Sequence, residues 1–164
     1  MDWSGFAVYA LPWTQASARL VGRAREMANM LGCYLRVITD NPAAAAAHGA
    51  DEVRTATSAS ADRLAAWTRT ATPEVWLFPD DDDAAAVAGR LAGLLGAPVQ
   101  EGLVSVDLDL NDRSLLMRLE TFRGRQLEEW AAVPEARPQI ALLKTDRLAD
   151  PIAEAREPEV SALP

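Results

Sequence analysis

An apolar run at residues 75–78, followed by acidic and then helical positions, shows the pattern that organises the chain. The run is too short for a helix and does not alternate, which is typical of a parallel strand buried on both faces. Pro79 and four consecutive aspartates interrupt it, and Val87, Leu91 and Leu94 then recur at helical spacing. The stretch therefore predicts a strand, an acidic loop and a helix, which form half of a βαβ unit.

Short apolar runs and helical stripes also alternate along the preceding residues. Strands are predicted at residues 6–11, 34–39 and 53–55, and helices at residues 16–31, 43–48 and 60–70. The order βαβαβαβα implies right-handed crossovers and a parallel sheet with helices on both faces. The predicted fold class is therefore α/β, with a Rossmann-like arrangement of three layers.

The pattern changes after Pro98, where apolar and polar positions alternate as in antiparallel strands. Two such runs occupy residues 103–110 and 114–122, and a turn at 123–125 leads to a return strand at 126–133. We therefore expect an antiparallel β appendage near the C-terminus.

The end of the chain contains one more apolar run, at residues 138–144, which we expect to rejoin the sheet as a buried strand. With it, residues 1–149 form a single domain of ordinary size. Proline and acidic residues are frequent in the remaining tail, residues 150–164. We expect this tail to be extended or disordered, or to lie on a partner.

Composition and charge narrow the function classes. Apolar residues make up 49% and charged residues 24% of the chain, as in a globular protein. The net charge of -8 argues against a nucleic acid or an anionic membrane surface as a partner. Residues 1–4 lack the basic start of a signal peptide, and no apolar run approaches the ~20 residues of a membrane span, so we expect a cytoplasmic protein. The single cysteine, Cys33, excludes an internal disulfide and is expected to be a buried thiol.

Several segments follow one another in an order and spacing that suggest a known family. They are the helix ARLVGRAREMANMLG, the box GADEV at residues 49–53, the strand VWLF, the helix end AGRLAGLLGAPV and the strand that Arg137 and Pro138 begin. In this order they resemble the N-terminal domain of the alpha subunit of electron-transfer flavoproteins, over most of residues 6–146. The resemblance implies an adenine nucleotide alpha-hydrolase-like fold and a β-type partner subunit.

The alpha chain of that family continues into a second domain that holds the flavin, whereas we expect a stand-alone domain here, without that second domain. FAD or AMP would then be bound in a complex, and this chain alone would bind no cofactor. Where the family tends to have a small hydroxyl residue and a Gly-Arg-Asp run, this sequence has Asp83 and three alanines. We expect the docking or structural half of a flavoprotein electron-transfer complex, whose partner is a β-type subunit or a second copy.

The loops after the predicted strands form a candidate cofactor crevice, because ligands of open parallel sheets lie at the carboxyl ends of the strands. Its candidate residues are Trp13, Thr14, Thr39, Asp40, Asp80 and Asp83. The loop after the first strand is not glycine-rich, and the aspartates would repel a phosphate from the helix N-terminus. Two alternatives stay open: a small adenine-nucleotide-binding module, and a homodimeric scaffold with a closed pocket.

Catalytic chemistry has no visible carrier in the sequence. No serine lies in a Gly-x-Ser-x-Gly motif, and the only histidine, His48, precedes a helix-ending glycine, where a surface imidazole is ordinary. Consecutive aspartates offer oxygens to a divalent cation but rarely converge on one ion, so a solvated helix cap without metal is expected. We predict no catalytic residues and no enzyme activity.

Partner contacts are expected on the β appendage. Trp130 lies in its return strand, and Arg123 and Arg125 lie in its turn, in the least acidic part of the chain. An exposed aromatic ring can anchor a partner, and arginines can attract an acidic one. The alternative interpretation is that this hairpin contacts only solvent.

Overall fold

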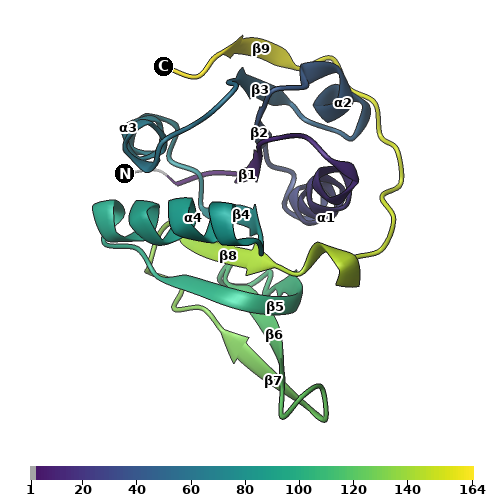
Figure 1. Cartoon of the computed structure of the whole chain (residues 1–164), viewed down its shortest axis with the longest axis vertical. Coiled ribbons are helices and arrows are strands. Elements are labelled where there is room, and N and C mark those ends of the chain that lie inside the picture. The colour runs from purple at the N-terminus through teal and green to yellow at the C-terminus, as the bar shows by residue number, and fades with distance from the viewer. Residues whose placement is uncertain (1–2) are drawn as a thin grey trace.

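The computed structural model describes residues 3–164. Met1 and Asp2, which belong to the segment searched for a signal peptide, lie outside the described residues. The described residues form a nine-stranded sheet in the order β7-β6-β5-β8-β4-β1-β2-β3-β9, with helices on both faces (Figure 1). The predicted α/β fold class is confirmed.

Five parallel strands form the centre of this sheet. They are β1 (Phe6–Ala10), β2 (Leu35–Thr39), β3 (Glu52–Thr55), β4 (Val75–Pro79) and β8 (Gln139–Leu143). Every side chain of β1 and β8 is buried, as the continuous apolar runs predicted. The run before residue 144 therefore does rejoin the sheet, beside β4.

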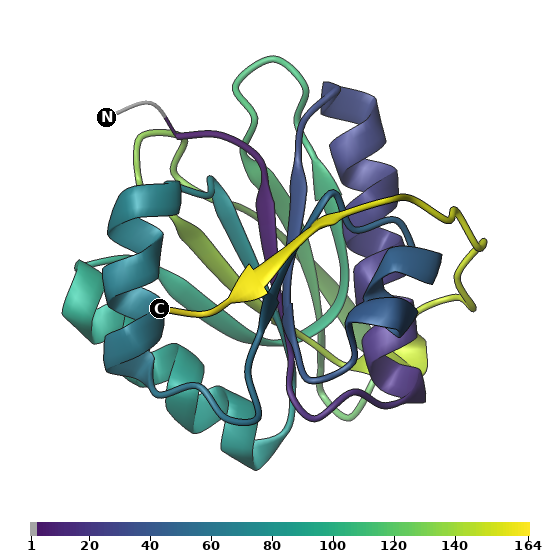
Figure 2. The same ribbon diagram turned by 90° about the horizontal axis from the view of Figure 1, so that it is seen from above.

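Four helices cover the two faces of the sheet, α1 and α2 on one and α3 and α4 on the other (Figure 2). They are α1 (Gln15–Leu31), α2 (Pro42–Ala47), α3 (Ala61–Ala71) and α4 (Asp82–Leu95). Side-chain oxygens of Asn41, Ser60 and Asp81 accept amide hydrogens at the starts of α2, α3 and α4. Gly32 and Gly96 end α1 and α4 in the left-handed conformation, with φ of 63° at both.

The antiparallel part of the sheet extends from β8. The long strand β5 (Val99–Leu108) first pairs in parallel with β8 and then, after a bulge, in antiparallel fashion with β6 (Leu115–Thr121). The strand β7 (Gln126–Ala131) pairs with β6 and forms the outer edge. We call β6, the turn 122–125 and β7 the arm, which projects from the body (Figure 1).

The tail runs along α1 and α2 and then joins the sheet. After the short 3-10 helix η1 (Thr145–Arg147), the chain is extended and ends in β9 (Glu159–Ala162), which pairs in parallel with β3. The sequence pattern did not predict this strand. Ion pairs of Arg19 with Asp150 (2.8 Å) and of Arg156 with Asp51 (2.7 Å) fasten the tail to the body.

No helix within residues 3–164 is both long and apolar enough to cross a membrane.

Candidate ligand cavity

A cavity lies where the order of the parallel strands reverses. From β1 the chain continues to β2 on one side, whereas β4 lies on the other side of β1. The loops that follow β1 and β4 therefore diverge and leave a crevice at the carboxyl ends of the strands, the usual place for ligands in open α/β sheets. A cavity of about 810 Å³ occupies this position.

The N-terminus of α1 forms one wall of the cavity. Thr14 and Ser17 line it, and the Thr14 N–H donates to Ser17 Oγ over 2.9 Å, which fixes the first turn of the helix. The amides of Gln15 and Ala16 lie in that first turn, where an α-helix has no carbonyl partner for its N–H groups. This wall can therefore offer hydrogen-bond donors to a ligand.

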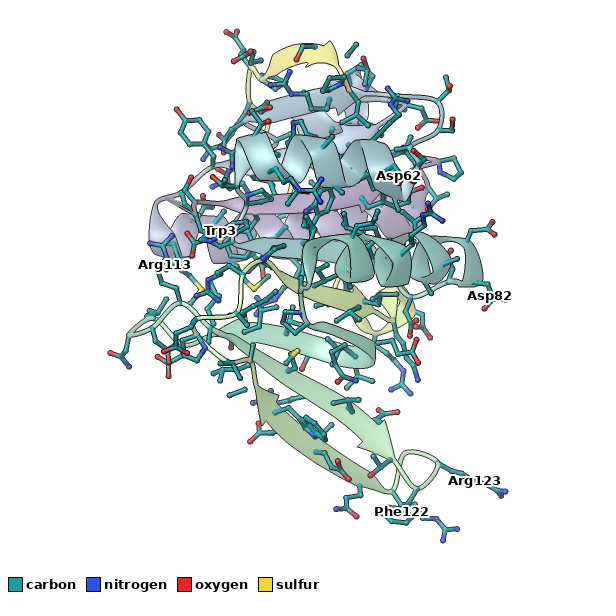
Figure 3. The ribbon with its side chains drawn as sticks, turned by 90° about the vertical axis from the view of Figure 1, so that its left-hand side faces the viewer. Trp3, Asp62, Asp82, Arg113, Phe122 and Arg123 are labelled. Atoms are coloured by element: carbon teal, nitrogen blue, oxygen red, sulfur yellow. The ribbon has the colours of Figure 1, made fainter. Side chains whose placement is uncertain are left out.

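The N-terminus of α4 forms the opposite, acidic wall. Asp81 accepts the Ala84 N–H over 2.9 Å, and the exposed carboxylates of Asp82 and Asp83 occupy the first turn beside it. The side chain of Asp82 extends away from the body of the protein (Figure 3). The negative charges of these carboxylates offset the partial positive charge at the N-terminus of α4, so this helix end does not attract an anion. The phosphate of AMP or the diphosphate of FAD does not fit this wall.

Asp80 has a structural contact as well as a place in the cavity wall. Its carboxylate accepts the N–H of Gly102 over 3.1 Å, at the bulge where β5 changes partners. Gly102 has a φ of 74°, a conformation that favours glycine. The loop after β4 is therefore tied to β5, and Asp80 is half-buried rather than free to turn toward a ligand.

Tyr9 lines the cavity from the end of β1, and its ring stacks on Phe78 with centroids 5.1 Å apart. Burial raises the pKa of the Tyr9 hydroxyl, and the negative charges of Asp81 and Asp83 raise this pKa further. The phenol therefore stays protonated well into the alkaline range. It gives the cavity a neutral donor between the two walls.

The six predicted crevice residues separate into two groups. Thr14, Asp80 and Asp83 line the cavity, whereas Trp13, Thr39 and Asp40 are not among its lining residues. Asp40 accepts the Trp13 N–H over 2.9 Å, and the Trp13 ring packs near His48 with centroids 5.8 Å apart. Thr39 is fully buried, and its hydroxyl accepts the Asn41 N–H over 3.1 Å. These three side chains stabilise the loops behind the cavity.

Among the lining residues that the sequence did not predict are Thr57, Ser58, Thr145 and Tyr9. Thr57 and Ser58 belong to the connection between β3 and α3, Thr145 follows β8, and Tyr9 lies within β1. The first three follow strands at the same edge of the sheet, so the rule that selected the loops after β1 and β4 could also have selected them. For Tyr9, the side of the strand on which its ring lies decides its exposure to the cavity.

The side chains of His48 and Cys33 lie outside the cavity, at a helix end and before a strand. No group of three or more His, Cys, Asp or Glu side chains within residues 3–164 is arranged to hold a metal ion. His48 ends α2, with its Nδ1 2.8 Å from the Ala44 carbonyl oxygen. Cys33 is half-buried in the turn before β2 rather than within the strand, and burial raises the pKa of its thiol.

The predicted partner residues lie on the arm. Trp130 is 53% exposed, and Arg123 and Arg125 are exposed in its turn. Phe122 and Arg123 extend into solvent from the tip (Figure 3). Neither arginine side chain has a hydrogen-bond or ion-pair partner within the described part of the chain. Arg123 and Arg125 can therefore contact another molecule without losing an internal interaction.

Comparison with known proteins gives one family. The model described as "Electron transfer flavoprotein domain" matches residues 14–164, which include the helices, the cavity walls, the arm and the tail. A search of curated proteins finds no match.

Proposed function

The chain belongs to the family of electron transfer flavoprotein domains, and we propose that it is a docking subunit of an electron-transfer complex. In this proposal the flavin is held by another chain of the family or at the interface with it. The subunit contributes shape and contacts and has no catalytic residues of its own.

The acidic wall of the cavity is the observation that supports this proposal most directly. Asp82 and Asp83 occupy the first turn of α4, the position at which a helix otherwise attracts a phosphate. A nucleotide cofactor would need its phosphates beside these carboxylates, in a chain whose net charge is already -8. The redox group of the complex is therefore assigned to another chain.

The arm is the docking surface in this proposal. It exposes apolar side chains that no other element covers, among them Phe122 at 72%, Leu127 at 54% and Trp130 at 53%. Solvent-exposed aromatic residues of this kind dominate the free energy of many protein interfaces. The unpaired guanidinium groups of Arg123 and Arg125 add positive charge at the tip, which favours a partner with an acidic surface.

Absorbance and mass spectrometry of the purified protein test the proposal. The chain expressed alone should show no flavin absorbance and release no adenine nucleotide on denaturation. Co-expression with a β-type electron transfer flavoprotein subunit and a flavin-binding domain of the same family should give a complex that carries flavin absorbance. A flavin that copurifies with the chain expressed alone would contradict the proposal.

A second candidate function is a small adenine-nucleotide-binding module. The position of the cavity between the N-termini of α1 and α4 favours it, since this is where α/β sheets bind nucleotides. Calorimetric titration with AMP separates the two. A docking subunit binds AMP only after Asp82 and Asp83 are replaced by serine, whereas a nucleotide module binds it without any substitution. Asp62→Ser combined with Glu129→Ser, at two exposed carboxylates outside the cavity, is the control for the change of two in net charge.

A further inference from the structure

The outer edge of β7 has backbone groups without partners in the sheet. The Ala132 N–H donates to the Leu115 carbonyl over 2.8 Å, which fixes the alternation of the β6–β7 ladder. It follows that Leu127, Glu129 and Ala131 direct their N–H and C=O groups away from β6, toward the open edge. An open edge of this kind is a template for another strand.

Apolar side chains flank this edge. Trp130 is 53% exposed and lies opposite Met117 of β6, and a groove of about 230 Å³ runs past both. The indole Nε1–H reaches Glu128 within the same strand, at 3.3 Å, so the polar atom of the ring is satisfied. The ring face is then free to pack on an apolar neighbour.

We infer that β7 pairs with β7 of a second copy in an antiparallel ladder, with Trp130 on the two-fold axis. This inference goes beyond the proposed function. The second copy occupies the open edge of β7, whereas the turn 122–125, with Phe122 and Arg123, lies outside the ladder and stays available to the chain that holds the flavin. Pairing across a two-fold axis is the commonest way in which identical chains associate.

Charge excludes two of the neighbouring registers. An axis at Glu128 places Glu128 opposite Glu128 of the second copy, and an axis at Glu129 places two Glu129 carboxylates opposite each other. Like charges directly opposite one another destabilise a strand pair. Neither carboxylate has a like-charged counterpart opposite when the axis lies at Trp130, because Glu129 then faces Ala131 and Glu128 faces Ala132.

Backbone hydrogen bonds exclude the registers farther out. An axis at Leu127 pairs Glu129 with Arg125, whose N–H already donates to the Phe122 carbonyl in the turn at 3.3 Å. An axis at Ala131 needs Val133 for its central pair with Glu129, but the Val133 carbonyl already accepts hydrogen bonds from the Ala136 N–H at 3.0 Å and from Gln139 Nε2 at 3.4 Å. In the Trp130 register Val133 faces Leu127 only at the end of the ladder. With the axis at Trp130, the free N–H and C=O groups of Glu129 and Ala131 pair with those of the second copy.

The Trp130 register also places the indole rings at the closest cross-strand position. Because the Trp130 backbone faces β6, the two Trp130 residues form a pair without direct hydrogen bonds, in which side chains approach most closely. Aromatic pairs at such positions are among the most stabilising cross-strand contacts. Self-association is therefore assigned mainly to one side chain.

Sedimentation velocity of the chain expressed alone tests this dimer. Wild-type protein should shift from monomer to dimer with rising concentration, and Trp130→Ala should raise the dissociation constant by about tenfold or more. Phe122→Ala is the matched control, because Phe122 is more exposed but lies outside the ladder. A monomer at every soluble concentration, or equal losses for the two variants, would overturn the inference.

Cysteine substitutions in a Cys33→Ala background test the register. Cross-strand Cα atoms at the axis are about 4.5 Å apart, within the range that a disulfide spans. Glu128 and Ala132 face each other at the same kind of position when the axis lies at Trp130, and both can be replaced while Trp130 is kept. Glu128→Cys combined with Ala132→Cys should form a disulfide-linked dimer under mild oxidation, whereas Leu127→Cys, Glu128→Cys and Glu129→Cys alone should not. Crosslinking at one of these three positions instead would overturn the Trp130 register. Flavin absorbance in the co-expressed complex tests the proposed function separately, whichever result the dimer experiment gives.

Discussion

The central strand β4 and the edge strand β7 each contain a tryptophan in a different setting. Trp76 in β4 has no exposed surface, its Nε1–H donates to Thr68 Oγ1 over 3.0 Å, and its ring contacts Trp67 at a centroid distance of 5.5 Å. Trp130 in β7 is 53% exposed. The two parts of the sheet therefore differ in role. The apolar side chains of the parallel body are buried in the core and stabilise the fold, whereas those of the arm are exposed and can contact another molecule.

Replacing each tryptophan by alanine is the strongest test of this comparison. Trp76→Ala leaves a large void in the core and is expected to lower the free energy of unfolding by about 3–5 kcal/mol. Trp130→Ala is expected to change it by less than about 0.5 kcal/mol, as at other exposed positions. Urea denaturation at a protein concentration low enough to keep the chain monomeric measures both. Similar losses for the two variants would show that the arm is part of the folding core.

An ion pair in the body can be compared with one on the arm. Asp51 binds Arg25 and Arg156, each at 2.7 Å, and accepts the Leu35 N–H, while Arg25 is only 4% exposed. Asp51→Ala leaves Arg25 hydrogen-bonded to the carbonyls of Gly49 and Cys33 but removes its ion-pair partner, and the uncompensated buried charge is expected to cost about 3 kcal/mol. The arm control is Glu129→Ala, whose exposed pair with Arg118 is expected to contribute less than about 1 kcal/mol.

The same pair gives an acid dependence. Burial opposes ionisation of Asp51, but the hydrogen bonds from Leu35, Arg25 and Arg156 outweigh it and hold the pKa of this carboxyl below its ordinary value. A lowered pKa stabilises the folded state above the unfolded-state value of ~3.9, and the stabilisation is lost as the pH falls through the folded-state pKa. Wild-type stability should therefore fall toward low pH more steeply than that of Asp51→Ala, and equal slopes would contradict this role.

Local patterns were sufficient to predict the body of the fold. Apolar runs marked the buried strands β1, β4 and β8, and helical spacing with Gly32 or Gly96 marked the ends of α1 and α4. The start of β5 at Val99 was missed, because it depends on pairing with Ile140 rather than on its own sequence. The strand β9 was missed for the same reason, since a short polar segment becomes a strand only beside β3.

The candidate cavity was predicted only in part, for a related reason. Thr14 and Asp83 follow strands that meet at the reversal of strand order, so chain order places them together. Thr39 is the last residue of β2, but β1 separates β2 from the reversal, and the Thr39 side chain is buried. The sequence predicts which loops lie at one edge, whereas the spatial order of the strands decides which loops share a cavity.

The tail covers the β3 edge of the sheet with β9, and displacing the tail would leave β3 with an open edge like that of β7. The tail passes α1 at Gly22, where a Cβ atom would lie 2.4 Å from the Pro151 Cβ. Gly22→Ala should therefore displace the tail, and the steric cost should cancel the gain of about 1 kcal/mol that alanine brings to a helix. Gly89→Ala on α4, where a Cβ meets nothing within 4 Å, should show that gain undiminished.

Hydrogen exchange of the tail amides measures the displacement. The Arg156 N–H, which donates to the Ala46 carbonyl at 2.9 Å, and the Glu159 N–H, which donates to the Asp51 carbonyl at 3.0 Å, should lose protection in Gly22→Ala and keep it in Gly89→Ala. Unchanged protection in Gly22→Ala would mean that the tail accommodates the added methyl group while keeping these hydrogen bonds, which would contradict the expected displacement.

The smallest expected effect concerns charge rather than packing, and it again sets the body against the arm. Burial, Asp81 and Asp83 all raise the Tyr9 pKa, in this order of size. Asp83→Asn should therefore move the Tyr9 pKa down, toward its ordinary value of ~10. Glu128→Gln makes the same change in net charge on the arm and should leave Tyr9 unchanged. Absorbance of tyrosinate during alkaline titration, with Tyr9→Phe to identify the signal, measures the shift.

The same change should alter the stability at alkaline pH. A raised pKa stabilises the folded state below pH ~10, and this contribution is lost as the pH rises through the folded-state pKa. In Asp83→Asn the free energy of unfolding should therefore fall less steeply with rising alkaline pH. An equal shift in Asp83→Asn and Glu128→Gln would mean that net charge, and not the acidic wall of the cavity, sets the Tyr9 pKa.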